Sequence, residues 1–196
     1  LKVDWAPFTL PDLSDMRRAL LDNPDTPRRT LERGDVDLAL ERATTRIGHD
    51  YLWSYQMHAS IGPSCAVAQC SESGVTVWSG TQNPHALRPA LAQLAGVEVD
   101  DITVIRHEAA GCYGRNCADD VCADALVLSQ AVGGRPVRVQ LTREQEHVWE
   151  PKGAAQLMQV RGGIMADGTP AGYVFSTRYP SNVSPMLALA LTGRID

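Results

Sequence analysis

Apolar and polar residues alternate with a changing period along the chain, and each change predicts an element. Residues 45–53 have the pattern of a strand, and residues 65–70 and 75–78 are short strand patterns joined by Ser-Glu-Ser-Gly. Residues 157–165 and 172–177 lie on either side of Ala-Asp-Gly-Thr, the best hairpin signal in the sequence. The chain is therefore expected to contain two hairpins.

Helical periodicity appears between these strands. The clearest helix follows Asn83, which is expected to cap it, and Gly96 lies just past its end. Further helices are expected after a Ser14 cap, after an Asp35 cap and over residues 120–131. The remaining predicted elements are two strands and one short helical turn: residues 102–105, residues 137–141, and a turn that begins with the capping-box pair Thr142 and Gln145.

Strands and helices mix without a strict βαβ rhythm, which predicts an α+β fold of mixed sheets with packed helices. A connector with two prolines, residues 23–33, precedes the regular pattern, so a domain boundary is expected between residues 33 and 34. The pattern fades after Pro180. No final element is predicted there.

Composition excludes several classes of protein. The formal net charge of −5 argues against nucleic acid as a general partner, because phosphate contacts need a basic surface. No run of about 18 apolar residues occurs, so no transmembrane helix is expected. Five cysteines, an odd number, indicate reduced thiols and an intracellular, cytoplasmic setting. The periplasm and the periphery of the inner membrane are the alternatives.

A glycine loop, Gly111-Cys112-Tyr113-Gly114, precedes a predicted helix. Small residues let backbone N–H groups turn toward a ligand, and a helix start favours negative charge, so the loop is a candidate binding site for an anionic cofactor group. The alternative is a plain turn in which Asp119 and Asp120 cap the helix. Neither standard nucleotide-binding fingerprint occurs.

Gln82 follows a predicted strand, where its amide could donate to an oxo or carbonyl group or could simply stabilise the turn. Cys112, Cys117 and Cys122 recur at every fifth residue, which fits no usual zinc or iron–sulfur spacing. No metal ligands are therefore predicted, and Cys122 is expected in the core. His58 lies in a candidate site loop, but a structural role is the default for all five histidines.

Three ordered blocks carry a resemblance to a known family: TVWSGTQNPHALRPALAQLAGV, AAGCYGRN and GRPVRVQLTREQEH. Together they resemble the molybdopterin-binding large subunit of the molybdenum hydroxylases, the xanthine dehydrogenase and aldehyde oxidase family. The resemblance covers about residues 34–180. The chain is most similar to the isoquinoline 1-oxidoreductase beta-subunit and nicotinate dehydrogenase type, because Gly62 stands where the more usual pattern has glutamate and GCYGRN replaces Gly-Gly-Phe-Gly-Gly-Lys.

The resemblance implies the first part of that family's molybdopterin-binding domain. Residues 1–33 would be the end of a preceding domain with its linker, and residues 34–196 would be the N-terminal part of the cofactor-binding domain. Gln82 matches the glutamine that hydrogen-bonds an oxo ligand of molybdenum. The backbone of the glycine loop, Gly111, Cys112, Tyr113 and Gly114, would approach the pterin, whose dithiolene holds the metal without protein ligands.

The activity implied is hydroxylation of an N-heterocyclic aromatic, similar to isoquinoline or nicotinate, with water as the oxygen source. The implied cofactor is molybdenum with molybdopterin cytosine dinucleotide. The implied partners are the remainder of the large subunit and a small subunit with [2Fe-2S] clusters. The alternatives are an aldehyde oxidoreductase of the same family and a non-catalytic α+β scaffold or subunit-binding module.

The family's second cofactor loop and its catalytic glutamate would both lie beyond residue 196. The chain is therefore expected to be a fragment without hydroxylase activity of its own, and to self-associate through an apolar face that another domain normally covers. Assaying the isolated chain with isoquinoline or nicotinate and an artificial electron acceptor tests the first expectation. Turnover would refute it.

Overall fold

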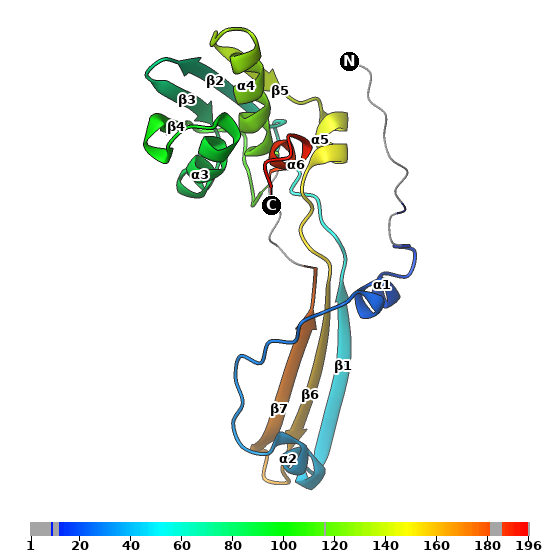
Figure 1. Cartoon of the computed structure of the whole chain (residues 1–196). Coiled ribbons are helices and arrows are strands. Elements are labelled where there is room, and N and C mark those ends of the chain that lie inside the picture. The colour runs from blue at the N-terminus through cyan, green and yellow to red at the C-terminus, as the bar shows by residue number, and fades with distance from the viewer. Residues whose placement is uncertain (1–8, 10–11, 116, 181–185, 196) are drawn as a thin grey trace. The chain divides into compact units, whose positions relative to one another are not determined.

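The structure is a computed structural model that describes residues 9, 12–115, 117–180 and 186–195 (Figure 1). The chain divides into two compact units, each built from two segments. Unit 1 comprises Leu1–Tyr55 and Ala154–Ser181, and unit 2 comprises Gln56–Gly153 and Asn182–Asp196. The domain boundary expected at residue 33 stays a prediction.

Unit 1 is built on a three-stranded antiparallel sheet with the order β1-β6-β7. Its strands are β1 (Thr45–Trp53), β6 (Gln156–Ile164) and β7 (Pro170–Arg178). Strands β6 and β7 are the hairpin predicted around Ala-Asp-Gly-Thr, and β1 has the predicted bounds. Two helices, α1 (Met16–Asp22) and α2 (Val36–Arg42), complete this unit.

Helix α2 packs closely on the sheet because glycines face it. A Cβ on Gly163 would lie 2.6 Å from the Cβ of Ala43, at the end of α2. Asp35 caps α2, as predicted, by accepting a hydrogen bond from the N–H of Leu38. The predicted Ser14 cap of α1 is wrong, because the side chain of Asp15 accepts from the N–H of Arg18 and fills that role.

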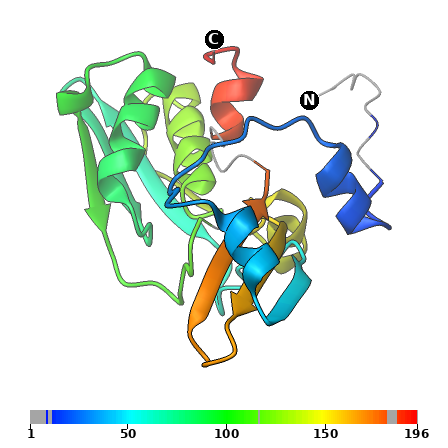
Figure 2. The ribbon, with the colours of Figure 1, turned by 90° about the horizontal axis from the view of Figure 1, so that it is seen from below.

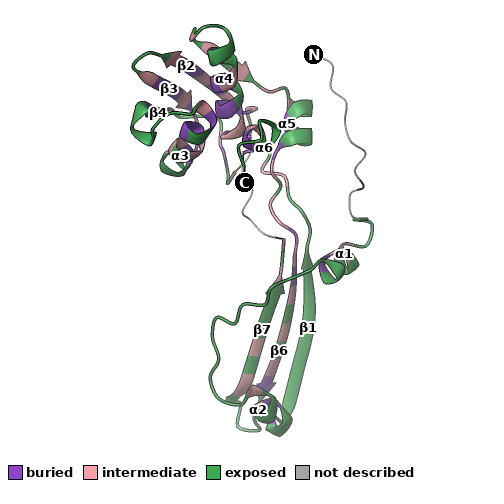
Figure 3. Cartoon of the chain, viewed as in Figure 1, coloured by how far each residue is buried: buried purple, intermediate pink, exposed green. Residues whose placement is uncertain are grey.

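The opposite face of this sheet carries large apolar side chains. Figure 3 shows that β1 is exposed along its length. Cross-strand pairs place Tyr51 beside Met158, and Phe175 beside Val160, on one face. We name this the aromatic face, after the side chains on it that are at least half exposed: Ile47, Tyr51, Trp53, Tyr173 and Phe175. Exposed apolar side chains gathered on one face are typical of interaction sites.

Unit 2 contains a mixed four-stranded sheet with the order β4-β3-β2-β5. Its strands are β2 (Cys65–Ser71), β3 (Gly74–Ser79), β4 (Ile102–Arg106) and β5 (Val137–Gln140). Strand β3 pairs with β4 in parallel, whereas β2 pairs antiparallel with both β3 and β5. The predicted α+β fold with mixed sheets is confirmed.

Helices α3 (Pro84–Ala95) and α4 (Asp120–Ala131) lie side by side against this sheet (Figure 2). The core between them and β2 and β3 includes Val77, Leu91 and Cys122, all fully buried. The predicted cap of α3 is confirmed, because Asn83 accepts from the N–H of Ala86 and Gly96 ends the helix with φ +75°.

Two shorter helices complete unit 2. Helix α5 (Arg143–Trp149) begins with the predicted capping box of Thr142 and Gln145. Helix α6 (Leu187–Leu191) contradicts the prediction that no element follows Pro180. A one-turn 3-10 helix, η1 (Val99–Asp101), precedes β4. Among the described residues, no helix combines the length and apolar character needed to cross a membrane.

Replacing Tyr173 and Phe175 by threonine is expected to weaken self-association of the isolated chain about tenfold, equivalent to about 1.4 kcal/mol, because two exposed rings are lost. Threonine keeps the preference for strand. Sedimentation velocity over a concentration series measures the change. The matched control is Leu128→Gln with Val132→Thr, two exposed apolar residues of unit 2. An equal loss in the control, or a wild-type chain that stays monomeric, would contradict the expectation.

Candidate functional site

The structure brings Gln82 and the glycine loop together. Gln82 lies between β3 and α3, and its Oε1 accepts a hydrogen bond of 2.7 Å from the N–H of Gly114. Because a backbone N–H can only donate, this contact identifies the atom facing the loop as the amide oxygen. The Nε2 of Gln82 donates to no other described residue, and the side chain is exposed. Gln82 therefore presents an N–H donor that is held in place and is uncommitted, which means that it bonds no described residue.

The glycine loop has an unusual backbone that only certain residues adopt. Gly111 has φ +106° and Gly114 has φ +115°, and Tyr113 between them has φ +55°. A Cβ on Gly114 would lie 2.7 Å from Nε2 of His58. The thiol of Cys112 donates to the carbonyl oxygen of Gly114 at 2.7 Å and so braces the turn from inside. The His58 ring therefore excludes a side chain at Gly114.

Two neighbouring loops support the segment before the glycine loop. The N–H of Ile61 donates to the carbonyl of Ala110 at 3.1 Å. A Cβ on Gly62 would lie 2.8 Å from the Cβ of Ala110, and one on Gly80 would lie 2.4 Å from that of Ala109. Three segments of unit 2, those that contain His58, Gln82 and Gly114, therefore meet around one site.

The turn that carries Gln82 is anchored on both sides by its neighbour Thr81. The hydroxyl of Thr81 donates to Oδ1 of Asp119 at 2.6 Å and accepts from the N–H of Asn83. Nε of Arg106 donates to the carbonyl of Thr81 at 3.1 Å. Asp119 stands at the N-cap position of α4 but makes no capping hydrogen bond with its side chain, so its proposed capping role is wrong.

The start of α4 already holds negative charge. Asp120, its first residue, accepts through Oδ1 from Arg115 and from the N–H of Leu187, whereas its Oδ2 is buried and has no partner among the described residues. Burial raises the pKa of Asp120 above its ordinary range, and the nearby Arg115 opposes that shift. Two carboxylates at this helix start disfavour a phosphate there.

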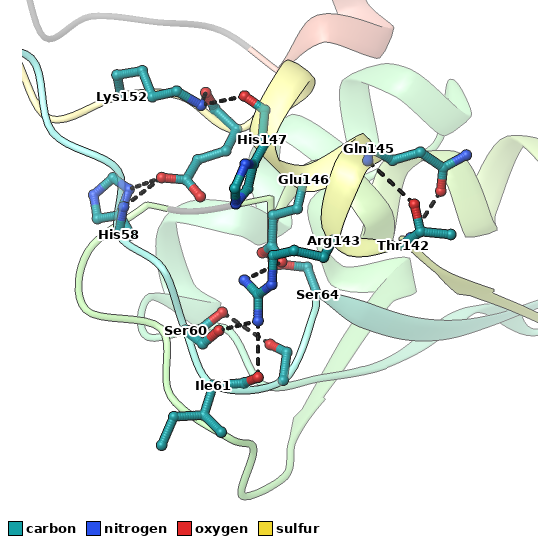
Figure 4. Close-up of polar contacts among 12 residues, drawn as sticks. His58, Ser60, Ile61, Ser64, Thr142, Arg143, Gln145, Glu146, His147 and Lys152 are labelled. Atoms are coloured by element: carbon teal, nitrogen blue, oxygen red, sulfur yellow. Dashed lines mark hydrogen bonds and ion pairs between the residues drawn. The ribbon is translucent and has the colours of Figure 1, made fainter.

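Sequence reasoning missed two buried acids, Glu146 on α5 and Glu150 just after it. Figure 4 shows Glu146 beside Arg143 and Ser64. Glu146 is fully buried and accepts from the hydroxyl of Ser64 at 2.7 Å and from Arg143 at 3.3 Å. Glu150, one helical turn later, is also buried and accepts from the backbone N–H of His58. The i, i+4 spacing of the two acids was the available signal.

The three evenly spaced cysteines do not form a metal site in the described residues, where no group of three potential ligands gathers. Cys122 lies in the core, as predicted, with its thiol donating to the carbonyl of Ala118. Burial raises the pKa of the Cys117 and Cys122 thiols to about 12. Neither thiol is therefore a nucleophile near neutral pH.

Alkylation by iodoacetamide at pH 8 is expected to be at least about 100-fold slower at Cys117 and Cys122 than at Cys65 and Cys70, which are only half-buried, because a thiol with a pKa about 12 is almost wholly protonated. Mass spectrometry of timed samples gives the rates. In denaturant all four should react alike. Fast native labelling of Cys117 or Cys122 would contradict the buried placement.

Residues present at the site fit a molybdopterin cofactor in two respects. The Nε2 of Gln82 is an uncommitted donor held in place, and the glycine loop presents backbone where any Cβ on Gly114 would clash. No protein thiol or imidazole cluster is needed, because a dithiolene on the cofactor would hold the metal. Gln82 and the four loop residues 111–114 would hold the group; these roles stay predictions.

Comparison with known proteins identifies relatives of the chain. The chain is 62% identical over its whole length to a nicotinate dehydrogenase subunit of Pseudomonas putida, but spans only 17% of that protein. It is 26% identical to the xanthine dehydrogenase molybdenum-binding subunit of Escherichia coli O157:H7, with 74% of this chain and 19% of that one covered. Quinoline 2-oxidoreductase from Pseudomonas putida 86 shares the fold, with a TM-score of 0.62 at 19% identity over 74% of this chain and 19% of that chain. A model of the molybdopterin cofactor-binding domain matches residues 21–189, and the chain belongs to that family.

Proposed function

We propose that this chain is part of the molybdenum cofactor-binding subunit of an oxidoreductase that hydroxylates an N-heterocyclic aromatic, with water as the source of oxygen. The observation that carries the proposal is the orientation of Gln82, whose amide oxygen is held by Gly114 while its N–H donors are uncommitted among the described residues. Preorganised donors of this kind stabilise charge that develops during a reaction. When bound, the cofactor supplies the oxidation–reduction chemistry.

The chain's own residues bind and orient the cofactor. Gln82 donates through Nε2, and the backbone of Gly111, Cys112, Tyr113 and Gly114 lines the pterin. Thr81 keeps the Gln82 turn in place through its contacts with Asp119 and Arg106. Molybdopterin cytosine dinucleotide is the form we propose.

A nicotinate-like or isoquinoline-like substrate is favoured by two features. One relative with 62% identity is a nicotinate dehydrogenase subunit. Gly62 lies against Ala110, beside the glycine loop, in the place where the more usual family pattern has a glutamate. Without a carboxylate at that position, the substrate side of the site lacks one acid, which fits a different set of substrates from xanthine or aldehydes.

The proposed partners follow from the same assignment. A small partner subunit with [2Fe-2S] clusters would accept the electrons, and the remainder of the large subunit would supply the catalytic glutamate. The aromatic face of unit 1 supplies apolar surface for one of these associations. The cytoplasm is the compartment we propose.

Gln82→Glu in the complete complex tests the donor role. Glutamate keeps an oxygen that accepts from Gly114 but loses both N–H donors, so turnover is expected to fall about 10²–10³-fold, as when one preorganised donor is removed elsewhere. Nicotinate, isoquinoline and an aldehyde are assayed in parallel with an artificial electron acceptor. The substrate that the wild type turns over separates the heterocycle hypothesis from the aldehyde hypothesis.

The matched control is Gln130→Glu, the same change on the exposed side of α4. It removes the Nε2 donor that bonds the carbonyl of Ala95 at 3.4 Å, a contact outside the site, so turnover should stay unaltered. Molybdenum content per chain is measured on every variant, so that cofactor loss is told apart from slow chemistry. Unchanged turnover in Gln82→Glu would contradict the donor role. A wild-type complex without molybdenum would favour the non-catalytic scaffold.

A further inference from the structure

We infer that His58 and Glu150 form a positioning pair that holds the glycine loop, and through it Gln82, in the orientation needed for binding; this rests on the proposed function for the nature of the bound group. Neither side chain need touch the cofactor. Their effect is transmitted by contact through Gly114. The pair, the loop and Gln82 all belong to unit 2.

Glu150 fixes both the backbone and the ring of His58. It follows the last residue of α5, and its side chain is 0% exposed. Its Oε1 accepts from the backbone N–H of His58 and lies 3.1 Å from Nδ1 of the same residue. Figure 4 shows the His58 ring beside the end of α5, where Lys152 donates to the carbonyls of His147 and Glu150. One contact holds the backbone of His58 and the other holds its ring.

The His58 ring in turn forms a wall beside the glycine loop. A Cβ added to Gly114 would lie 2.7 Å from Nε2 and 2.8 Å from Cδ2 of the ring. With φ +115°, Gly114 can take up this conformation only because it has no side chain. The N–H of Gly114 points away to Oε1 of Gln82, at 2.7 Å. A continuous series of contacts therefore links Glu150, His58, Gly114 and Gln82.

The unpartnered oxygen of Glu150 indicates that the acid has a role beyond packing. Its Oε2 is buried and has no hydrogen-bond partner among the residues that the structure describes. Buried polar atoms without partners are rare and unfavourable, and an apolar residue of similar size would avoid the penalty. The two contacts that Oε1 makes with His58 are what an apolar residue could not supply.

A second set of contacts independently restrains the segment that follows His58. Arg143 donates to the carbonyls of Ser60 and Ile61, and Glu146 accepts from Ser64 (Figure 4). These contacts hold the backbone that follows His58 but do not include its ring. Removing the His58 ring should therefore loosen Gly114, while the segment of residues 60–64 stays in place.

His58→Ala in the complete complex is expected to raise the hydrogen-exchange rate of the Gly114 amide about tenfold, and to lower kcat about tenfold with little change in KM, as for other residues that orient a functional group. Glu150→Gln, which keeps the size of the side chain, should change both quantities in the same direction by less. Mass spectrometry with fragmentation of the loop peptide reads the exchange rate, which does not depend on turnover.

The matched control is His147→Ala, an exposed histidine on α5, which should leave Gly114 exchange at the wild-type rate. A wild-type rate in His58→Ala would overturn the inference. If His58→Ala speeds exchange throughout α3 and α4, the variant has lost its fold. The Gly114 exchange rate of Glu150→Gln then decides, and a wild-type rate in that variant would overturn the inference. Faster Gly114 exchange in His58→Ala, together with a wild-type complex that contains no molybdenum and shows no turnover, would contradict the proposed function and leave the positioning pair standing.

Discussion

The hydrogen bond from the Gly114 N–H to Oε1 of Gln82 is the contact on which the functional site depends. A glutamine side chain on a surface turn can present either its oxygen or its nitrogen, and rotation exchanges the two. Here a backbone donor selects the oxygen, so the nitrogen stays without a hydrogen bond to any described residue. The contact also joins two loops that are 32 residues apart in the sequence. One bond thus sets both the shape and the polarity of the site.

Rigid elements hold these loops from behind. Strand β3 and helix α4 include fully buried residues such as Val77 and Val121, and the polar network of Thr81, Asp119 and Arg106 lies where these elements end. Sites on the ends of well-packed elements keep their geometry better than sites on free loops. The buried acids of α5 extend this support to the segment that carries His58.

Strong local signals made much of the fold predictable. Periodicity and caps gave α3 and the β6–β7 hairpin, because their stabilising contacts are mostly close in sequence. The residue pattern also gave β1, although its partner strand β6 lies far along the chain. Helix α6 was missed because five residues, LALAL, without a side-chain cap carry no periodic signal. Asp15 replaced Ser14 as a cap because neighbouring polar residues compete for one position.

The candidate site was predictable only in part. Gln82 and the glycine loop could be singled out by residue type and resemblance, but the bond between them needed coordinates. The contact of Glu150 with His58 spans 92 residues, and no local pattern encodes it. Long-range polar contacts between loops are the part of a site that sequence alone leaves undetermined.

Electron cryo-microscopy of the complete complex, isolated with its cofactor, would test the role of Gln82 most directly. The predicted map places the cofactor against the glycine loop, with Nε2 of Gln82 within hydrogen-bonding distance of an oxygen of the molybdenum centre and Oε1 still bound to Gly114. A cofactor bound away from this loop, or a Gln82 amide turned away from it, would contradict that role.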